Sequence, residues 1–451
     1  MKNKMRVHFL LGVAGLIALS GCADRFGLVP SAPKSASIVV GDEPYAVRAA
    51  AEAMTQGGNA VDAAVALYFS LSVTYPVAAG LGGGGLCLVH DPAKSEDVEF
   101  DFLVRDTIAK GEFGVPGNVR GFASMHAAYG ALPWQRVIAA SEGYASTGFP
   151  ISQALAKRLA ASENVVRLDA GLAAEFMDES GHVKPADSVV SNREIAETLT
   201  AIRTLGSSAF YAGPISEKIA AYSSAQGGAI TVREIAAYRA DQSYASAVQF
   251  GDQSVFLPKP SVGAGAFAST LLDNVQRALN AAREGSNTEG VVVAATKQAL
   301  SSYGVSNLPG DLGATGFATM DVNGEAVACA VTMNGPFGSG HTAQGSGVTL
   351  AKAPSSSQAG LASAFLTPAI ATDGDGRVVF VAAGAGGPIG TASIADALAR
   401  LSRGEVVTRR GGTGDPNLAL YDTMNAILCH EGTCSALLDA GANGLSASPS
   451  R

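Results

Sequence analysis

A long uncharged stretch, residues 63–89, limits the folds open to this chain. It contains Pro76 and four consecutive glycines at residues 82–85. A membrane-spanning helix needs about 20 apolar residues in unbroken helix, and these proline and glycine residues interrupt such a helix. The stretch therefore predicts a buried helix, a turn and a buried strand over residues 86–90, and not a membrane span.

The spacing of apolar residues elsewhere predicts alternating helices and strands. Alanines at helical spacing predict a helix over residues 42–57, and Asn59 is a suitable N-cap for a second helix over residues 59–72. Further helices are expected at 118–130, over most of 134–240, at 264–283 and at 391–402. Apolar, β-prone runs predict strands at 98–105, 253–258, 317–320, 326–333, 347–350 and 378–383. This mixture indicates a layered α/β fold.

Composition narrows the functional classes. Hydrophobic residues make up 47% and charged residues 16% of the 451-residue chain, which is enough apolar material for a large core. The net charge is −8 and no long basic run occurs, so nucleic acid is not an expected partner.

The amino terminus resembles a lipoprotein signal. Lysine and arginine residues precede an apolar run at residues 9–19, and LSGC follows at residues 19–22. We expect residues 1–21 to be a signal peptide, Cys22 to carry lipid, and residues 22–37 to be a tether. The protein would then face the periplasm, with the membrane as a partner through Cys22. The alternative is an ordinary signal peptide in which the cysteine is a coincidence.

Four further cysteines allow two kinds of prediction. Cys87 and Cys329 lie in apolar, strand-like runs and are expected to be buried free thiols. Cys429 and Cys434 flank a four-residue segment, which favours a small-loop disulfide in an oxidising compartment. A metal site is the alternative for this second pair, although one histidine and two cysteines are a weak signal. We expect no metal and no cofactor.

Several motifs, in order, resemble the gamma-glutamyltransferase family. The strongest is QGGNAVDAAVA at residues 56–66. The others are VTYP (73–76), GGGGL (82–86), DF (101–102), VPG (115–117), YGALPW (129–134), AFYAG (209–213), DVNGEAVA (321–328), TMN (332–334), FGSG (337–340) and GAGG (384–387). The resemblance runs from about residue 38 to residue 400.

The resemblance implies an αββα sandwich and a self-cleaving precursor. Cleavage would divide one intertwined domain into a large-subunit-like region, residues 38–314, and a small-subunit-like region, residues 315–451. The newly exposed threonine would act as nucleophile, with its own α-amine as base. The implied activity is transfer or hydrolysis of γ-glutamyl or related amides of the glutathione type, with a small amide or peptide as substrate.

The nucleophile position departs from the family pattern. The family has TTHxSVxD, whereas this chain has ATGFATMD at residues 314–321. Ungapped alignment places Ala314, which has no hydroxyl, at the nucleophile position. Thr315 is the first usable threonine, and one residue reverses the face of a strand. Thr315 is therefore the candidate nucleophile if the start of its strand is reshaped. The alternative is an ordinary strand threonine in an uncut protein.

Other candidate residues carry over from the same motifs. Thr332 matches a threonine that hydrogen-bonds the nucleophile, and Asn334 matches an asparagine at the substrate carboxylate. Gly386 and Gly387 follow a strand and precede a helix, where backbone N–H groups can hold an oxyanion. Arg105 corresponds to the arginine that pairs with the glutamyl carboxylate, although the match is loose.

Much of the family's recognition set is missing. Its NNQMDD segment reads AKAPSS here, at residues 351–356, and its SSMSP segment reads AFLTP, at residues 364–368. A buried amino-acid head group needs charged or hydrogen-bonded partners, so the substrate is expected to differ from a standard γ-glutamyl compound. Two interpretations stay open: an amidohydrolase or acyltransferase with altered preference, or a degenerate, membrane-anchored relative that binds a ligand or protein.

Overall fold

The structure is a computed structural model that describes residues 37–260, 263–282, 286–305, 310–356, 359–407, 424–438 and 444–449. Residues 35–451 form one compact unit. The predicted signal peptide, nearly all of the tether and Cys22 lie outside the described residues.

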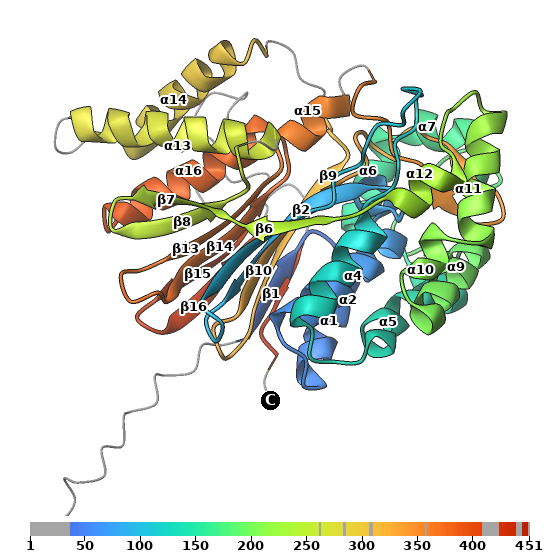
Figure 1. Cartoon of the computed structure of the whole chain (residues 1–451), viewed down its shortest axis with the longest axis horizontal. Coiled ribbons are helices and arrows are strands. Elements are labelled where there is room, and N and C mark those ends of the chain that lie inside the picture. The colour runs from blue at the N-terminus through green and yellow to red at the C-terminus, as the bar shows by residue number, and fades with distance from the viewer. Residues whose placement is uncertain are drawn as a thin grey trace, which may run out of the picture. The chain divides into compact units, whose positions relative to one another are not determined.

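Two antiparallel sheets form the centre of this unit (Figure 1). The first has the strand order β17-β1-β9-β10-β2-β3-β6, and the second has the order β16-β15-β14-β13-β8-β7. The first sheet consists of β1 (Ile38–Gly41), β2 (Gly84–Asp91), β3 (Glu96–Asp101), β6 (Asp241–Tyr244), β9 (Ala314–Met320), β10 (Ala326–Thr332) and β17 (Leu445–Ala447). The second consists of β7 (Ser246–Phe250), β8 (Gln253–Leu257), β13 (Thr367–Thr372), β14 (Val378–Gly384), β15 (Met424–His430) and β16 (Thr433–Leu437).

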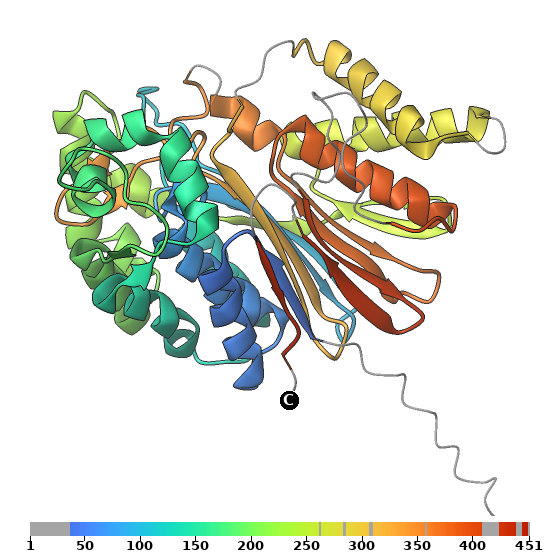
Figure 2. The ribbon, with the colours of Figure 1, turned by 180° about the vertical axis from the view of Figure 1, so that it is seen from behind.

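Helices cover the outer face of each sheet (Figure 2). The first sheet is covered by α1 (Pro44–Thr55), α2 (Ala60–Thr74), α4 (Asn118–Tyr129) and α5 (Trp134–Thr147), and the second by α13 (Gly263–Ala281), α14 (Thr288–Ser302) and α16 (Pro388–Ser402). The predicted αββα sandwich is confirmed.

Shorter elements complete the described part. They are α3 (Pro76–Ala79), α6 (Gln153–Ala161), α7 (Glu163–Leu168), α8 (Ala170–Phe176), α9 (Arg193–Leu205), α10 (Ser208–Tyr211), α11 (Pro214–Ala225), α12 (Val232–Ala237), α15 (Ala359–Ala364), and the two-residue strand pairs β4 (Phe149–Pro150) with β5 (Val189–Val190) and β11 (Thr342–Ala343) with β12 (Val348–Thr349).

The strands alternate between two apolar interiors. In β9, Ala318 and Met320 join the cluster between the sheets, whereas Phe317 joins the cluster under the helices. This alternation follows from the two-residue period of a strand. It assigns each residue of β9 either to the space between the sheets or to the helical layer.

Local predictions succeeded where capping or a long apolar run marked an element. Asn59 caps α2 in a reciprocal capping box with Asp62, which is buried. The strand expected at 98–105 ends earlier, because β3 stops at Asp101 and the chain turns away there. The strand expected at 347–350 is only the two residues of β12.

The expectation that Cys87 and Cys329 are free thiols is wrong. The two residues lie directly opposite each other on β2 and β10 and form a disulfide, with 4.2 Å between their Cα atoms. Their partnership is invisible in the sequence because 242 residues separate them. The disulfide predicted between Cys429 and Cys434 is confirmed, in the hairpin of β15 and β16.

The first prediction concerns the free energy of unfolding. Replacing both Cys87 and Cys329 by Ala should lower it by about 2–5 kcal/mol, because the disulfide restricts the unfolded chain. The matched control is the Cys429→Ala, Cys434→Ala double variant, which opens a far shorter loop and should cost about 3 kcal/mol less by loop entropy. Urea unfolding without reductant measures both, and equal losses would contradict the prediction.

Glu43, the N-cap of α1, is a buried carboxyl. Its Oε2 accepts hydrogen bonds from the Ala46 N–H at 2.8 Å and from the Thr74 hydroxyl at 2.7 Å. Burial raises the pKa of Glu43 to about 7, against the opposing effect of these hydrogen bonds. The carboxyl therefore keeps its proton in the folded protein at pH values where the unfolded chain loses it.

The second prediction follows from this raised pKa. The stability that protonated Glu43 contributes is complete below pH 4.5 and is lost as the pH rises to about 7. Glu43→Gln removes this loss, so the variant should exceed the parent in stability at pH 8 by about 3 kcal/mol more than at pH 4.5. Urea unfolding at the two pH values measures this difference. The prediction is wrong if the variant's effect is the same at both.

Candidate functional site

The register of β9 on β10 separates the two candidate nucleophile positions. Ala314 lies opposite Thr332, and Thr315 lies opposite Val331. Opposed residues of antiparallel strands share a face, and consecutive residues alternate. Ala314 therefore shares the face of Thr332, whereas Thr315 faces the other way.

Ala314 lies among apolar side chains on its face. Its neighbours belong to both sheets and to a helix of the second layer, and they are Leu86, Leu103, Ala264, Ala330, Leu366 and Ala385. The position that the family pattern assigns to a hydroxyl is thus part of an apolar cluster here.

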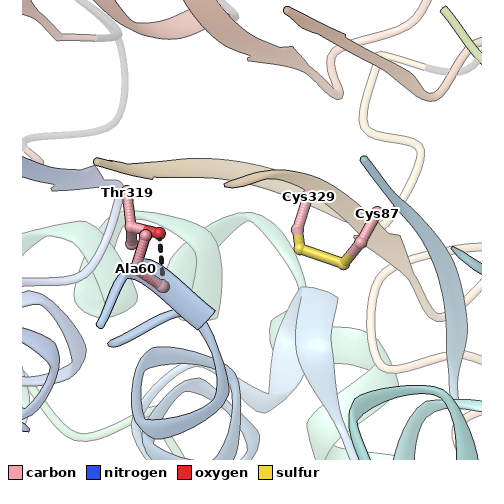
Figure 3. Close-up of a disulfide and its surroundings, with 4 residues drawn as sticks. All are labelled: Ala60, Cys87, Thr319 and Cys329. Atoms are coloured by element: carbon pink, nitrogen blue, oxygen red, sulfur yellow. Dashed lines mark hydrogen bonds between the residues drawn. A yellow bond between two sulfur atoms is a disulfide. The ribbon is translucent and has the colours of Figure 1, made fainter. Parts of the chain in front are cut away.

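Thr315 points toward the helical layer of the first sheet. Thr319, four residues along β9, donates a hydrogen bond to the carbonyl of Ala60 at the start of α2. Figure 3 shows this contact on the same side of the strands as the Cys87–Cys329 disulfide. Thr315 belongs to the same alternating set, and its side chain is 1% exposed.

The Thr315 hydroxyl has a carboxylate partner. It donates a hydrogen bond of 2.5 Å to Oδ2 of Asp42, the residue that follows β1. Asn425 of β15 donates to the other oxygen of Asp42 at 2.6 Å and to the carbonyl of Gly316 at 2.8 Å. Burial raises the pKa of Asp42, and the hydrogen bonds from Thr315 and Asn425 and the charge of Arg158 partly offset this. A buried proton acceptor thus touches the candidate nucleophile.

Arg158 of α6 holds the peptide that precedes Thr315. Its Nη1 donates to the carbonyl oxygen of Ala314 at 3.2 Å, and its Nε donates to Asp311 at 2.9 Å. The guanidinium carbon lies 5.3 Å from the ring centre of Tyr75. The cation is therefore oriented by a carboxylate and an aromatic ring while it contacts this one carbonyl.

Thr332 fixes the chain just before Ala314. Its hydroxyl donates to the carbonyl of Gly313 at 3.0 Å and accepts from the N–H of Asn334 at 2.9 Å. Gly313 has φ +62°, and a Cβ there would lie 2.0 Å from the backbone of Gly335. Only glycine fits this position. The structure therefore brings Thr332 to the segment next to the candidate cleavage point, and not to the Thr315 hydroxyl.

Asn334 lies nearby with its side chain engaged. It has φ 58°, a conformation that asparagine tolerates better than most residues. Its amide donates to the carbonyl of Lys352 at 2.9 Å and accepts from the Ser363 hydroxyl at 2.9 Å. The Lys352 ammonium lies 3.3 Å from the point where a Cβ on Gly335 would stand. A cation thus lies within a few residues of the candidate cleavage point.

The paired-glycine turn approaches the same segment from the second sheet. Gly386 is exposed, and Gly387 precedes α16 with φ 79°. A Cβ on Gly387 would lie 3.0 Å from the Leu312 side chain. The turn and Thr332 therefore meet near residues 312–314, as the oxyanion role of the glycines requires, and that role stays a prediction.

Arg105 is occupied by carboxylates of its own neighbourhood. It pairs with Asp101 at 2.9 Å and with Asp241 at 3.3 Å, and its side chain is 39% exposed. An incoming substrate carboxylate would compete with these two groups. The role assigned to Arg105 stays a prediction.

Sequence reasoning missed Asp42, Arg158 and Asn425. Asp42 directly follows the apolar run of β1, and a charge at the end of a buried strand is the one signal that could have drawn attention to it. Arg158 lies on a helix with ordinary amphipathic spacing, and Asn425 lies far along the chain. Their proximity is a product of the fold.

Two classes of site find no support in the described ranges. Within them, no group of three or more His, Cys, Asp or Glu residues is arranged to hold a metal ion. The helices of the same ranges are all too short or too polar to cross a membrane.

Known proteins resemble this chain in sequence and fold. A curated glutathione hydrolase proenzyme of Escherichia coli is 32% identical over 292 residues, which cover 56% of this chain and 50% of that protein. A proenzyme of the same name from Pseudomonas aeruginosa is 30% identical over 253 residues, covering 52% and 44%. The match thus spans half or less of these relatives.

Solved structures share the fold. A cephalosporin acylase from Bacillus halodurans superposes with a TM-score of 0.76 at 17% identity, covering 92% of this chain and 96% of that one. The gamma-glutamyltranspeptidase of Helicobacter pylori superposes with a TM-score of 0.53 at 24% identity, covering 58% and 81%.

A sequence model of one family decides membership. The model described as gamma-glutamyltranspeptidase matches residues 46–302, which is more than half of the chain. These residues include the helices α1 and α2 and the strands β2 and β3 around the candidate site. The chain therefore belongs to the gamma-glutamyltranspeptidase family.

Proposed function

We propose that this protein is a self-processing amidohydrolase or acyltransferase that acts on γ-glutamyl or related amides. Thr315 is its nucleophile, freed by cleavage of the bond between Ala314 and Thr315. The observation that carries the proposal is the buried hydrogen bond from the Thr315 hydroxyl to Asp42. A threonine hydroxyl is a weak nucleophile until a base accepts its proton, and this one has a carboxylate in contact.

Family membership supports the reaction class. The curated relatives named above are glutathione hydrolases, two of them proenzymes, which is what a self-processing amide hydrolase would be called. The shift from position 314 to position 315 moves the nucleophile to the other face of β9. The base near it must then differ from the family arrangement, and Asp42 is available there.

The apolar environment of Ala314 favours a second candidate. Without a hydroxyl at that position, an uncut chain could bind a γ-glutamyl compound or a protein without turning it over. The two candidates make opposite statements about the covalent state of the 314–315 bond, so that bond decides between them.

Lys352 bears on the substrate. It lies where the family segment carries glutamine and acidic residues, and its ammonium lies beside Gly335, which packs on Gly313. A cation in place of an acidic residue suits a substrate carboxylate and not a substrate amine. The proposed substrate is therefore an amide whose acyl part ends in a carboxylate, with weak dependence on an α-amino group.

The cell envelope is the proposed location. The amino-terminal pattern ending at Cys22 supports a lipid anchor, and the two disulfides support an oxidising compartment. Labelling with a radioactive fatty acid, compared between the parent and Cys22→Ser, tests the anchor.

The third prediction concerns self-cleavage. The purified parent should yield two fragments whose new ends, read by mass spectrometry, are Ala314 and Thr315. Thr315→Ala should leave one intact chain, and Thr315→Ser should still be cut because a hydroxyl remains. Thr319→Ala, which removes another buried hydroxyl of β9, is the matched control and should be cut. An intact parent, or a Thr315→Ala chain that is cut, contradicts the proposal.

The fourth prediction concerns the acyl carboxylate. With the processed protein, Lys352→Met should raise KM for γ-glutamyl and glutaryl anilides about 10-fold or more, the effect of losing one charge-assisted hydrogen bond. Lys352→Arg keeps the charge and should restore most of the affinity. The comparison substrate is butyryl anilide, which has no carboxylate, and its KM should not change. An equal effect on all three anilides would refute the role of Lys352.

A further inference from the structure

We propose that Asp42 and Arg158 carry out the cleavage before Thr315, with Asp42 as proton acceptor and Arg158 as the group that stabilises the oxyanion. This inference rests on the proposed function, since it concerns how the same bond is broken. It assigns two residues to the reaction that the family motifs in this sequence do not include.

The position of Asp42 suits a proton acceptor. Its Oδ2 is 2.5 Å from the Thr315 hydroxyl, which is within the range for direct proton transfer. The carboxylate is 7% exposed, so water does not compete for it. Asn425 donates to the second oxygen at 2.6 Å and to the Gly316 carbonyl, and so orients Asp42 against β9.

The position of Arg158 suits an oxyanion partner. Its Nη1 donates to the carbonyl oxygen of Ala314 at 3.2 Å, which is the oxygen that becomes negative when the bond is attacked. Asp311 and Tyr75 hold the guanidinium on its other sides. The carbonyl of the bond to be cut is therefore polarised before reaction starts.

The remaining contacts hold the backbone on both sides of the bond. Thr332 fixes the carbonyl of Gly313 at 3.0 Å, and Asp311 accepts from the Gly313 N–H at 2.7 Å. Asn425 fixes the carbonyl of Gly316 at 2.8 Å. Restricting the peptide in this way lowers the entropic cost of an intramolecular attack.

The reaction balances with water as the only co-reactant. The Thr315 hydroxyl oxygen attacks the Ala314 carbonyl carbon while its proton passes to Asp42, and Arg158 stabilises the resulting oxyanion. The carbon–nitrogen bond then breaks, and the proton on Asp42 passes to the departing nitrogen. The product is an ester between Ala314 and the Thr315 side chain, with a free α-amine on Thr315. Water hydrolyses this ester to an Ala314 carboxylate and the free hydroxyl.

The experiment follows cleavage over time after cell-free synthesis of the full chain. Asp42→Asn should slow it about 100-fold to 10,000-fold, the usual effect of losing a general base. Arg158→Met should slow it about 100-fold to 1,000-fold, the effect of losing an oxyanion donor, and Arg158→Lys should recover part of the rate. Hydroxylamine, which attacks esters, should speed fragment release in the parent and leave the first step of Asp42→Asn slow.

The matched control is Glu43→Gln, which changes the neighbouring buried carboxyl but should leave the cleavage rate unchanged. Near-ultraviolet circular dichroism confirms that each variant is folded, and the Arg158→Lys rate tests the inference independently should Asp42→Asn not fold. A cut parent with Asp42→Asn or both Arg158 variants cut at the parental rate overturns this inference and leaves the proposed function standing. A parent that is never cut overturns both.

Discussion

The antiparallel pairing of β9 with β10 is the constraint on which the site depends. It sets Ala314 opposite Thr332 and Thr315 opposite Val331, so a difference of one residue in the sequence becomes a difference of face in the fold. The register cannot slip to bring Thr315 round, because Phe317 and Ala318 would then exchange the helical layer for the space between the sheets. Any chemistry at Thr315 must therefore use groups on the helical side.

Those groups come from distant parts of the chain and meet at the end of β1. Asp42 closes that strand, Arg158 arrives on α6, and Asn425 reaches across from β15 of the second sheet. Burying charges without partners would be costly, and here the carboxylate and the guanidinium are each satisfied by hydrogen bonds. The same contacts that make the burial tolerable also aim a proton acceptor and a cation at one peptide bond.

The sequence predicted the features that short-range patterns encode. The capping of α2 by Asn59 follows from residues three apart, and the disulfide of Cys429 and Cys434 follows from a short loop. The sandwich followed from a resemblance carried by many ordered motifs. Contacts between distant residues were beyond its reach: 273 residues separate Asp42 from Thr315, and 383 separate Asp42 from Asn425. One sequence without homologues offers no signal for such pairs.

The apolar cluster around Ala314 acquires a role once the bond is cut. Cleavage as proposed places a new carboxylate on Ala314 among Leu86, Leu103 and Leu366, where a charge has no adequate partner. The end of the upstream fragment is thereby driven out toward water, and its departure leaves a space next to the free Thr315. An alanine at this position thus does more than mark a lost hydroxyl. It fills the site in the precursor with a residue whose new terminus cannot stay there, which couples cutting of the chain to opening of the space for a substrate.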